Sequence, residues 1–253
     1  MVRMIMHGCN GKMGRAITAI CQEDPEVEIV AGVDPYTGID NPYPVFSKIE
    51  DCSIEADVVV DFASASAVDG LLDYCVSKKM PVVVCTTGLS EGQLAKVEES
   101  SQTIAVLKSA NMSLGVNIVV DLLKRAARVL APAGFDMEIV EKHHNQKVDA
   151  PSGTALALAD SINEALGGGY QYKYDRTPER KKREKNEIGV HAVRGGSIVG
   201  EHEVIFAGMD EVIEIKHTAY SRAVFGKGAV EAAKFLAGKP AGKYGMEDVI
   251  EGR

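Results

Sequence analysis

The residues best suited to chemistry lie together in the stretch EKHHNQKVDAPSGTALALAD, residues 141–160. His143 and His144 can exchange protons near neutral pH, and Lys147 adds a positive charge close by. Adjacent residues of a strand point to opposite faces and no cysteine is nearby, so the two histidines do not predict a metal site. One structural histidine beside an exposed lysine is the alternative, and the residues that follow weigh against it.

An anion-binding helix start is predicted directly after this lysine. Ser152 is a natural N-cap for the alanine-rich segment that follows. The backbone N–H groups of Gly153 and Thr154 would then face outward at the positive end of a helix, where carboxylates and phosphates bind. A proton donor beside an anion site favours chemistry on a small acidic molecule.

The first strand–turn–helix pattern of the chain predicts a dinucleotide site. Glycines at 8, 11 and 14 follow a short apolar strand and open a helix, which lets the backbone approach a pyrophosphate. A second apolar strand ends at Asp34, 20 residues after Gly14, where an acidic side chain would bond the ribose hydroxyls of NAD. A tight turn without a ligand is the alternative, and the spacing of this aspartate argues against it.

The rest of the first half continues the alternation of strands and helices. Segments 56–63, 80–88 and 103–112 read as buried β-branched strands, separated by helix-like segments. Such alternation predicts an α/β fold with a Rossmann-like, doubly wound parallel sheet, whose ligand crevice lies beyond the carboxyl ends of the strands.

The middle of the chain changes character and predicts a second, α+β domain. A helix begins at Leu114, residues 135–144 alternate as a half-buried strand, and later glycine-punctuated strands predict a mixed, open-faced sheet. The helix predicted over 226–238 returns to cover the first domain. We therefore expect a dinucleotide-binding domain of residues 1–113 plus 225–253, and a substrate-binding domain of residues 114–224.

Composition excludes several other classes of function. The net charge of −8 disfavours nonspecific binding to nucleic acid, and the basic run 176–187 is interrupted by glutamates and lacks aromatic residues, as in a solvated loop. No apolar run is long enough to cross a membrane, and the N-terminus does not resemble a secretory signal. Five cysteines without a CxxC pair fit a reducing cytoplasm.

An anion site beside a proton donor, facing a bound nicotinamide, predicts hydride transfer to an acidic, unsaturated small molecule. The stretch 141–155, EKHHNQKVDAPSGTA, closely resembles the motif of the dihydrodipicolinate (4-hydroxy-tetrahydrodipicolinate) reductases of the diaminopimelate route to lysine. The resemblance covers essentially the whole chain: GCNGKMG at 8–14, DFAS at 61–64, TTG at 86–88 and ANMSLGVN at 110–117 also match. The histidine motif is highly specific, whereas the glycine loop alone is not.

This resemblance implies a fold, an activity and a set of roles. The fold is a Rossmann domain completed by the C-terminal helix, plus a substrate domain that builds a homotetramer. His143 is the implied acid/base, Lys147 the implied proton donor and carboxylate contact. The implied binding residues for the carboxylates of the substrate are His144, Gly153 and Thr154. The implied dinucleotide contacts are Gly8, Cys9, Asn10, Gly11, Lys12, Met13, Asp34, Cys85, Thr86, Thr87, Ser109, Ala110, Asn111 and Met112.

The implied reaction is NAD(P)H-dependent. Loss of the 4-hydroxyl group gives a conjugated imine, hydride reaches C4, and C3 is protonated. Arg194 and Arg222 could add positive charge for the dicarboxylate substrate, or they could belong to structural ion pairs.

Three departures from the family pattern bear on the cofactor. Cys85 replaces a usual glycine, and Lys12 stands where arginine is common. Asp34 is followed by Pro35 and Tyr36, with no arginine or lysine before Lys48, although a 2′-phosphate beside a carboxylate needs a cation. We therefore expect NADH to be favoured, with some use of NADPH supported by Lys12.

Two rival functions stay open at this point. A related reductase on the same two-domain plan would act on another amino-acid-derived imine or aldehyde, and would tolerate the loss of Lys147. A non-catalytic dinucleotide-binding module would use the basic run 176–187 to bind an acidic partner.

Overall fold

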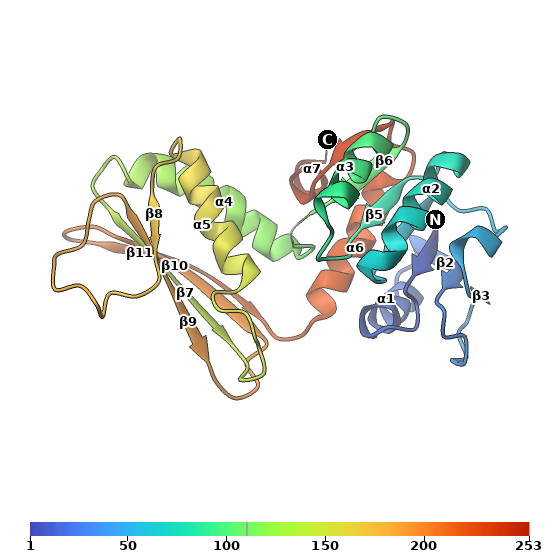
Figure 1. Ribbon diagram of the computed structural model, residues 1–253, viewed down its shortest axis with the longest axis horizontal. Coiled ribbons are helices and arrows are strands. Elements are labelled where there is room, and N and C mark those ends of the chain that lie inside the picture. Colours follow the sequence, from blue (N-terminus) through green and yellow to red (C-terminus); the bar gives the residue numbers. More distant parts are fainter. Residues whose placement is uncertain (110, 253) are drawn as a thin grey trace. The chain divides into compact units, whose positions relative to one another are not determined.

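The chain folds into two compact units in the computed structural model, which describes residues 1–109 and 111–252. Unit 1 comprises Met1–Leu114 and Ala223–Arg253, and unit 2 comprises Gly115–Arg222. Figure 1 shows that each unit has its own sheet and its own helices.

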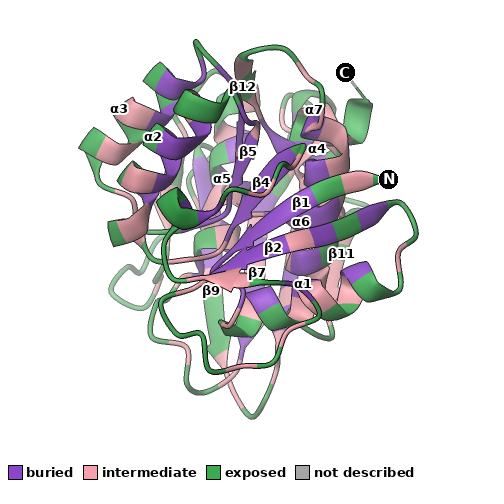
Figure 2. Cartoon of the chain, turned by 90° about the vertical axis from the view of Figure 1, so that its right-hand side faces the viewer, coloured by how far each residue is buried: buried purple, intermediate pink, exposed green. Residues whose placement is uncertain are grey.

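Unit 1 is built on a parallel sheet with the strand order β12-β6-β5-β4-β1-β2-β3 among the residues described. The central strands are short runs of apolar, mostly β-branched residues because both of their faces are buried (Figure 2). The strands are β1 (Val2–His7), β2 (Val27–Val33), β3 (Val45–Phe46), β4 (Val58–Asp61), β5 (Val82–Val84), β6 (Ala105–Lys108) and β12 (Gly242–Tyr244).

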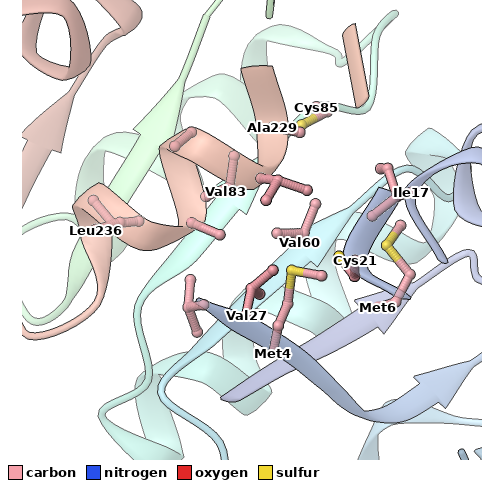
Figure 3. Packing of buried hydrophobic residues seen from close by; sticks show 14 of the residues in the cluster. Met4, Met6, Ile17, Cys21, Val27, Val60, Val83, Cys85, Ala229 and Leu236 are labelled. Atoms are coloured by element: carbon pink, nitrogen blue, oxygen red, sulfur yellow. The ribbon is translucent and has the colours of Figure 1, made fainter. Parts of the chain in front are cut away.

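Helices cover both faces of this sheet. On one face α1 (Lys12–Gln22) and α6 (Ala223–Leu236) pack against side chains such as Met4, Val60 and Val83 (Figure 3). On the other face lie α2 (Val68–Lys78) and α3 (Glu91–Ser100). The remaining helical segments of unit 1 are α7 (Met246–Glu251) and the 3₁₀ turns Ile49–Asp51 and Ala65–Ala67.

Unit 2 contains a mixed sheet with the strand order β11-β10-β7-β9-β8. Its central strand β7 pairs antiparallel with β10 and parallel with β9. The strands are β7 (Asp136–His143), β8 (Gln171–Lys173), β9 (Glu187–Arg194), β10 (Gly200–Ala207) and β11 (Val212–Ala219).

Helices cover one face of the unit 2 sheet (Figure 1). Apolar residues of α4 (Leu114–Leu130) and α5 (Gly153–Ala165) pack on the inward side chains of the strands, among them Met137, Ile139 and Phe206. The burial of β7 alternates residue by residue, as its sequence predicts. The opposite sheet face carries side chains such as Val140 and Ile205, which alternate with the core positions of the same strands.

The predicted fold class is confirmed in both units. The observed strands β4, β5 and β6 are shorter than the predicted segments 56–63, 80–88 and 103–112, because each begins two residues later and ends before the predicted carboxyl end. The last long helix begins at Ala223 instead of 226 and packs on the unit 1 sheet, as expected. Among the helices described, none is both long and apolar enough for a membrane span.

Candidate functional site

The loop between β7 and α5 brings the predicted site residues of unit 2 together. His143 is the last residue of β7, and its carbonyl oxygen accepts from the backbone N–H of Gly195, 2.9 Å away. The following turn is closed by a hydrogen bond from the Lys147 N–H to the His144 carbonyl oxygen, at 3.2 Å. The sheet therefore fixes the first histidine, and the turn returns the lysine toward it.

The predicted cap at the start of α5 is confirmed. The Ser152 hydroxyl oxygen accepts from the Ala155 N–H at 3.1 Å, and its backbone is extended, as at an N-cap. A Cβ atom at Gly153 would meet no heavy atom within 4 Å, so open space lies over this helix start. The N–H groups of the first turn lie at the positive end of the helix dipole, where small anions bind, and the backbone N–H of Gly153 already helps to lower the pKa of the Asp149 carboxyl.

His143 is held by a buried carboxylate on its own strand. Its Nδ1 lies 2.6 Å from Oε2 of Glu141, two residues earlier and on the same side of the sheet. Gly200 of β10 leaves room for the ring, since a Cβ atom there would lie 3.1 Å from Nε2 of His143. The imidazole is therefore fixed at one nitrogen and bordered by a glycine at the other.

Glu141 is fully buried and accepts from three groups. Arg194 donates to both carboxylate oxygens, each at 2.7 Å, and the Ser152 N–H donates to Oε1 at 2.9 Å. Burial alone would raise the pKa of Glu141, but the hydrogen bonds from Arg194, His143 and the Ser152 N–H outweigh it and lower the pKa. The carboxylate is thus ionised, so it only accepts, and Nδ1 of His143 must carry the proton that it shares.

The open question about the two arginines is answered for one of them. Arg194 is a structural partner of Glu141 and also donates to the Asp149 carbonyl oxygen at 2.6 Å. Arg222 is exposed at the end of unit 2. Only the latter keeps a solvent-facing charge.

Lys147 has an ion-pair partner within its own loop. Its Nζ lies 2.8 Å from Oδ1 of Asp149, whose side chain is 58% exposed. The hydrogen bond from Lys147 lowers the pKa of Asp149, so this carboxyl group is ionised at neutral pH. An incoming carboxylate would compete with Asp149 for this ammonium.

Further histidines surround the site in unit 2. Nε2 of His202 lies 3.0 Å from the Ser152 hydroxyl, and its ring contacts His143 edge-on with 5.2 Å between centroids. Burial lowers the pKa of His202 to about 4, so it is neutral at pH 7. Nδ1 of His144 is buried and has no partner within residues 1–109 and 111–252, a polar deficit of the kind that binding sites carry.

In the glycine-rich loop of unit 1, backbone segments approach each other as closely as the glycine spacing predicts. Gly8 has a φ of +82°, and a Cβ atom there would lie 2.7 Å from the Phe62 carbonyl oxygen. Gly11 caps α1 with extended backbone and no side-chain hydrogen bond, which leaves the first N–H groups of this helix for a ligand. This cradle fits a pyrophosphate.

Asp34 lies beside this loop and is anchored to it. Its Oδ2 accepts from the Asn10 N–H and its Oδ1 from the Tyr36 N–H, each at 3.0 Å. A neighbouring cavity of about 670 Å³ is lined by His7, Val33, Pro35, Lys48 and Ser64, among others. The cavity has the size of a site for a nucleoside, and the whole arrangement fits a dinucleotide.

The other residues that the sequence predicts to contact a dinucleotide form two groups, one with buried side chains and one with exposed or partly exposed side chains. The side chains of Cys9, Cys85, Thr86 and Met112 are buried, and those of both cysteines and the methionine pack in the core, so only their backbone atoms can face a ligand. Cys85 therefore fills the core where the family has glycine. The residues of this set that are exposed or partly exposed are Gly11, Lys12, Met13, Thr87, Ser109 and Asn111. Ala110 lies outside the described residues.

Two arginines of the basic run 176–187 form ion pairs with glutamates. Arg183 donates to Glu138 on β7 at 3.0 Å and Arg176 donates to Glu187 at 2.7 Å, while Glu138 also pairs with His191 at 2.8 Å. These ion pairs leave less free positive charge in the run than its sequence suggests.

Glu141, Ser152 and His202 complete the candidate site, and Glu141 is the one that sequence reasoning should have singled out. The strand alternation places it on the same face as Met137 and Ile139, in the core. A charged residue on a buried face requires a partner, so its position alone signals a buried ion pair.

Comparisons with known proteins place both units in the same family. Residues 2–112 match the family model described as dihydrodipicolinate reductase, N-terminus, and residues 115–250 match the corresponding C-terminus model. The chain is 54% identical over 251 residues to the 4-hydroxy-tetrahydrodipicolinate reductase of Caldanaerobacter subterraneus subsp. tengcongensis, covering 99% of each chain. It is 53% identical to that of Clostridium tetani, covering 99% and 97%. A dipicolinate-bound dihydrodipicolinate reductase from Paenisporosarcina sp. TG-14 has a similar fold, with a TM-score of 0.80, 24% identity and 97% coverage of each chain.

Proposed function

Since the chain belongs to the dihydrodipicolinate reductase family, we propose that its two units divide one reaction, with unit 1 binding a pyridine nucleotide and unit 2 binding the substrate. The reaction is the reduction of 4-hydroxy-tetrahydrodipicolinate in the diaminopimelate route to lysine, the activity for which relatives about half identical over their full length are named. Dipicolinate, bound in the related Paenisporosarcina structure, is a dicarboxylate like this substrate.

The arrangement in unit 2 supports specific roles for its residues. The first N–H groups of α5, at Gly153 and Thr154, bind one carboxylate of the substrate, and Lys147 and His144 bind through their side chains. Nε2 of His143 exchanges the proton, because Nδ1 is held by Glu141. The observation that carries this proposal is the meeting, in one loop, of a fixed imidazole, an ammonium and a helix start with open space beside Gly153.

The glycine cradle and Asp34 support the role of unit 1. When bound there, a reduced nicotinamide supplies the hydride. The backbone N–H groups at the start of α1 hold the pyrophosphate, and the Asp34 carboxylate accepts from the ribose hydroxyls. Ser109, Asn111 and Met112 lie beyond the carboxyl end of β6, and Cys85 to Thr87 lie beyond that of β5, where parallel sheets bind ligands.

NADH is the preferred cofactor in this proposal. The Asp34 carboxylate would repel a 2′-phosphate, and the residues that directly follow it, Pro35 and Tyr36, carry no positive charge. Lys12 and Lys48 are the cations that would support residual use of NADPH, since Lys48 lines the cavity beside Pro35.

We also propose a cytoplasmic homotetramer. All five cysteines are free and buried, as expected in a reducing compartment. The helix-free face of the unit 2 sheet exposes Val193 and Val212, at 44% and 56%, beside the partly buried Val140 and Ile205. A sheet face of this kind is suited to pairing with further copies of the chain.

Turnover of freshly generated 4-hydroxy-tetrahydrodipicolinate tests the function and the site together. Purified protein is assayed with NADH and with NADPH, beside Lys147→Ala and the matched variant Lys142→Ala, whose lysine pairs with Glu201 on the sheet. We expect Lys147→Ala to lose about 10²–10⁴-fold in kcat/KM and Lys142→Ala to retain activity. Folded protein that binds NADH but lacks turnover would favour a reductase of another imine, and retention on heparin with no activity toward any imine would favour the binding module.

A further inference from the structure

The most heavily bonded side chain described in the site region of unit 2 is Glu141, which is not among the site residues expected from the sequence. Its buried carboxylate joins three parts of the site. It accepts from Nδ1 of His143 at the end of β7, from the guanidinium of Arg194 at the end of β9, and from the N–H of Ser152 at the cap of α5.

From this geometry we propose that Glu141 is the positioning residue of the reaction, holding His143 in one tautomer and the start of α5 at a fixed place beside it. The inference rests on the proposed function, in which His143 exchanges the proton and the start of α5 binds a carboxylate. A single carboxylate thus sets the position of the proton-exchanging group relative to the anion site.

Arg194 has the complementary role. Its two bonds to Glu141 supply the opposite charge that a buried carboxylate needs, and its bond to the Asp149 carbonyl fixes the loop that leads into Ser152. Since both carboxylate oxygens are occupied, neither can rotate away from the histidine without losing a charged hydrogen bond.

The tautomer follows from these contacts. An ionised glutamate only accepts, so the neutral imidazole of His143 keeps its proton on Nδ1 and presents the lone pair of Nε2. His202 faces the ring of His143 from β10 with an edge contact, and Gly200 borders Nε2. Lys147 and Asp149 are the charged groups of the adjoining loop, and they pair with each other. Of these, Glu141 is the group that hydrogen-bonds the imidazole.

The chain offers a matched control for this cluster. Glu138, on the same strand but the opposite face, also accepts from a histidine and an arginine, His191 and Arg183. Glu138→Gln therefore removes the same kind of charge from a Glu–His–Arg cluster that contains none of the proposed site residues.

The experiment compares Glu141→Gln, Glu138→Gln and His143→Gln in the full-length protein. We expect Glu141→Gln to lower kcat by about 10²-fold and to shift the pH dependence of kcat/KM to lower pH, because an amide stabilises the protonated imidazole less than a carboxylate. Glu138→Gln should leave both unchanged. The ¹⁵N spectrum of the six histidines, with His143 assigned from His143→Gln, should show a single Nδ1–H tautomer that becomes mixed in Glu141→Gln.

Glu141→Gln leaves the charge of Arg194 without its partner, which could destabilise the fold. A second variant separates this effect from the effect on the tautomer. Glu141→Gln with Arg194→Met restores neutrality in the core, and we expect it to fold like the wild type while keeping the mixed tautomer and the low kcat. An unchanged tautomer and an unchanged pH profile in folded Glu141→Gln would overturn the inference. If instead His143→Gln has wild-type activity, the proposed function of His143 fails, and the tautomer measurement still reports on Glu141 alone.

Discussion

The ammonium of Lys147 and the carboxylate of Asp149 form an ion pair, with 2.8 Å between Nζ and Oδ1. Both groups lie in the loop that leads to the start of α5. The lysine proposed to bind a substrate carboxylate is thus already bound to an internal one. A substrate carboxylate that binds Lys147 must displace Asp149 from it. The free energy of substrate binding is therefore reduced by the free energy of this ion pair.

Asp149→Asn should therefore lower the KM for substrate, because it frees Lys147. An exposed ion pair contributes about 0–1 kcal/mol, so the decrease should reach at most about fivefold. The control is Asp175→Asn, which removes an exposed aspartate from the loop before the basic run. An increase in KM, as expected for Lys147→Ala, would show that Asp149 positions the lysine instead of competing for it.

Gly8→Ala should weaken NADH binding by more than about tenfold, since a left-handed backbone and a clash with the Phe62 carbonyl oxygen both oppose the side chain. Gly134→Ala carries similar backbone strain in unit 2, at a φ of +90° with open space around it. Gly134→Ala should lose about 1–2 kcal/mol of stability and Gly8→Ala at least as much, but only Gly8→Ala should lose binding in a fluorescence titration with NADH. If Gly8→Ala bound NADH as tightly as the wild type, the glycine-rich loop would not be the pyrophosphate site.

Asp34→Asn should shift the cofactor preference toward NADPH. Removing the carboxylate charge should lower the KM for NADPH by about tenfold, because a close pair of like charges costs about 1 kcal/mol or more even in water. The KM for NADH should rise, since the amide binds the ribose hydroxyls less strongly. Steady-state kinetics with both cofactors measures the ratio, and a wild-type enzyme that already prefers NADPH would refute the role given to Asp34.

The stability of unit 2 should fall as the pH drops from 6.5 toward 4. The folded pKa of His202 is about 4 against 6.5 when unfolded, so the unfolded chain takes up a proton in this range while the folded chain does not. The loss between pH 7.5 and pH 5 should be about 2 kcal/mol in urea unfolding. His202→Gln should flatten this dependence, and an unchanged slope would mean that another group causes it.

Val212→Glu should reduce the assembly to smaller species, because it puts a charge on the helix-free face of the unit 2 sheet. Met209→Glu is the matched control, since Met209 is 97% exposed in the loop that precedes the same strand. Light scattering after gel filtration gives the mass of each variant. If both retain the mass of the wild type, the copies associate through another surface.

The sequence by itself determined the fold class and the location of both candidate sites. The alternation of apolar strands with helix-like segments predicts the doubly wound sheet, and the glycine spacing predicts the dinucleotide site, because strand burial and backbone approach depend on local residue type. The Ser152 cap was likewise predictable, since it involves residues three positions apart. The tertiary structure decided which distant groups meet. Arg194 reaches Glu141, 53 residues away, because β9 pairs parallel with β7 in the register that sets His143 beside Arg194. Strand register depends on the packing of whole sheet faces, and a local pattern cannot specify it.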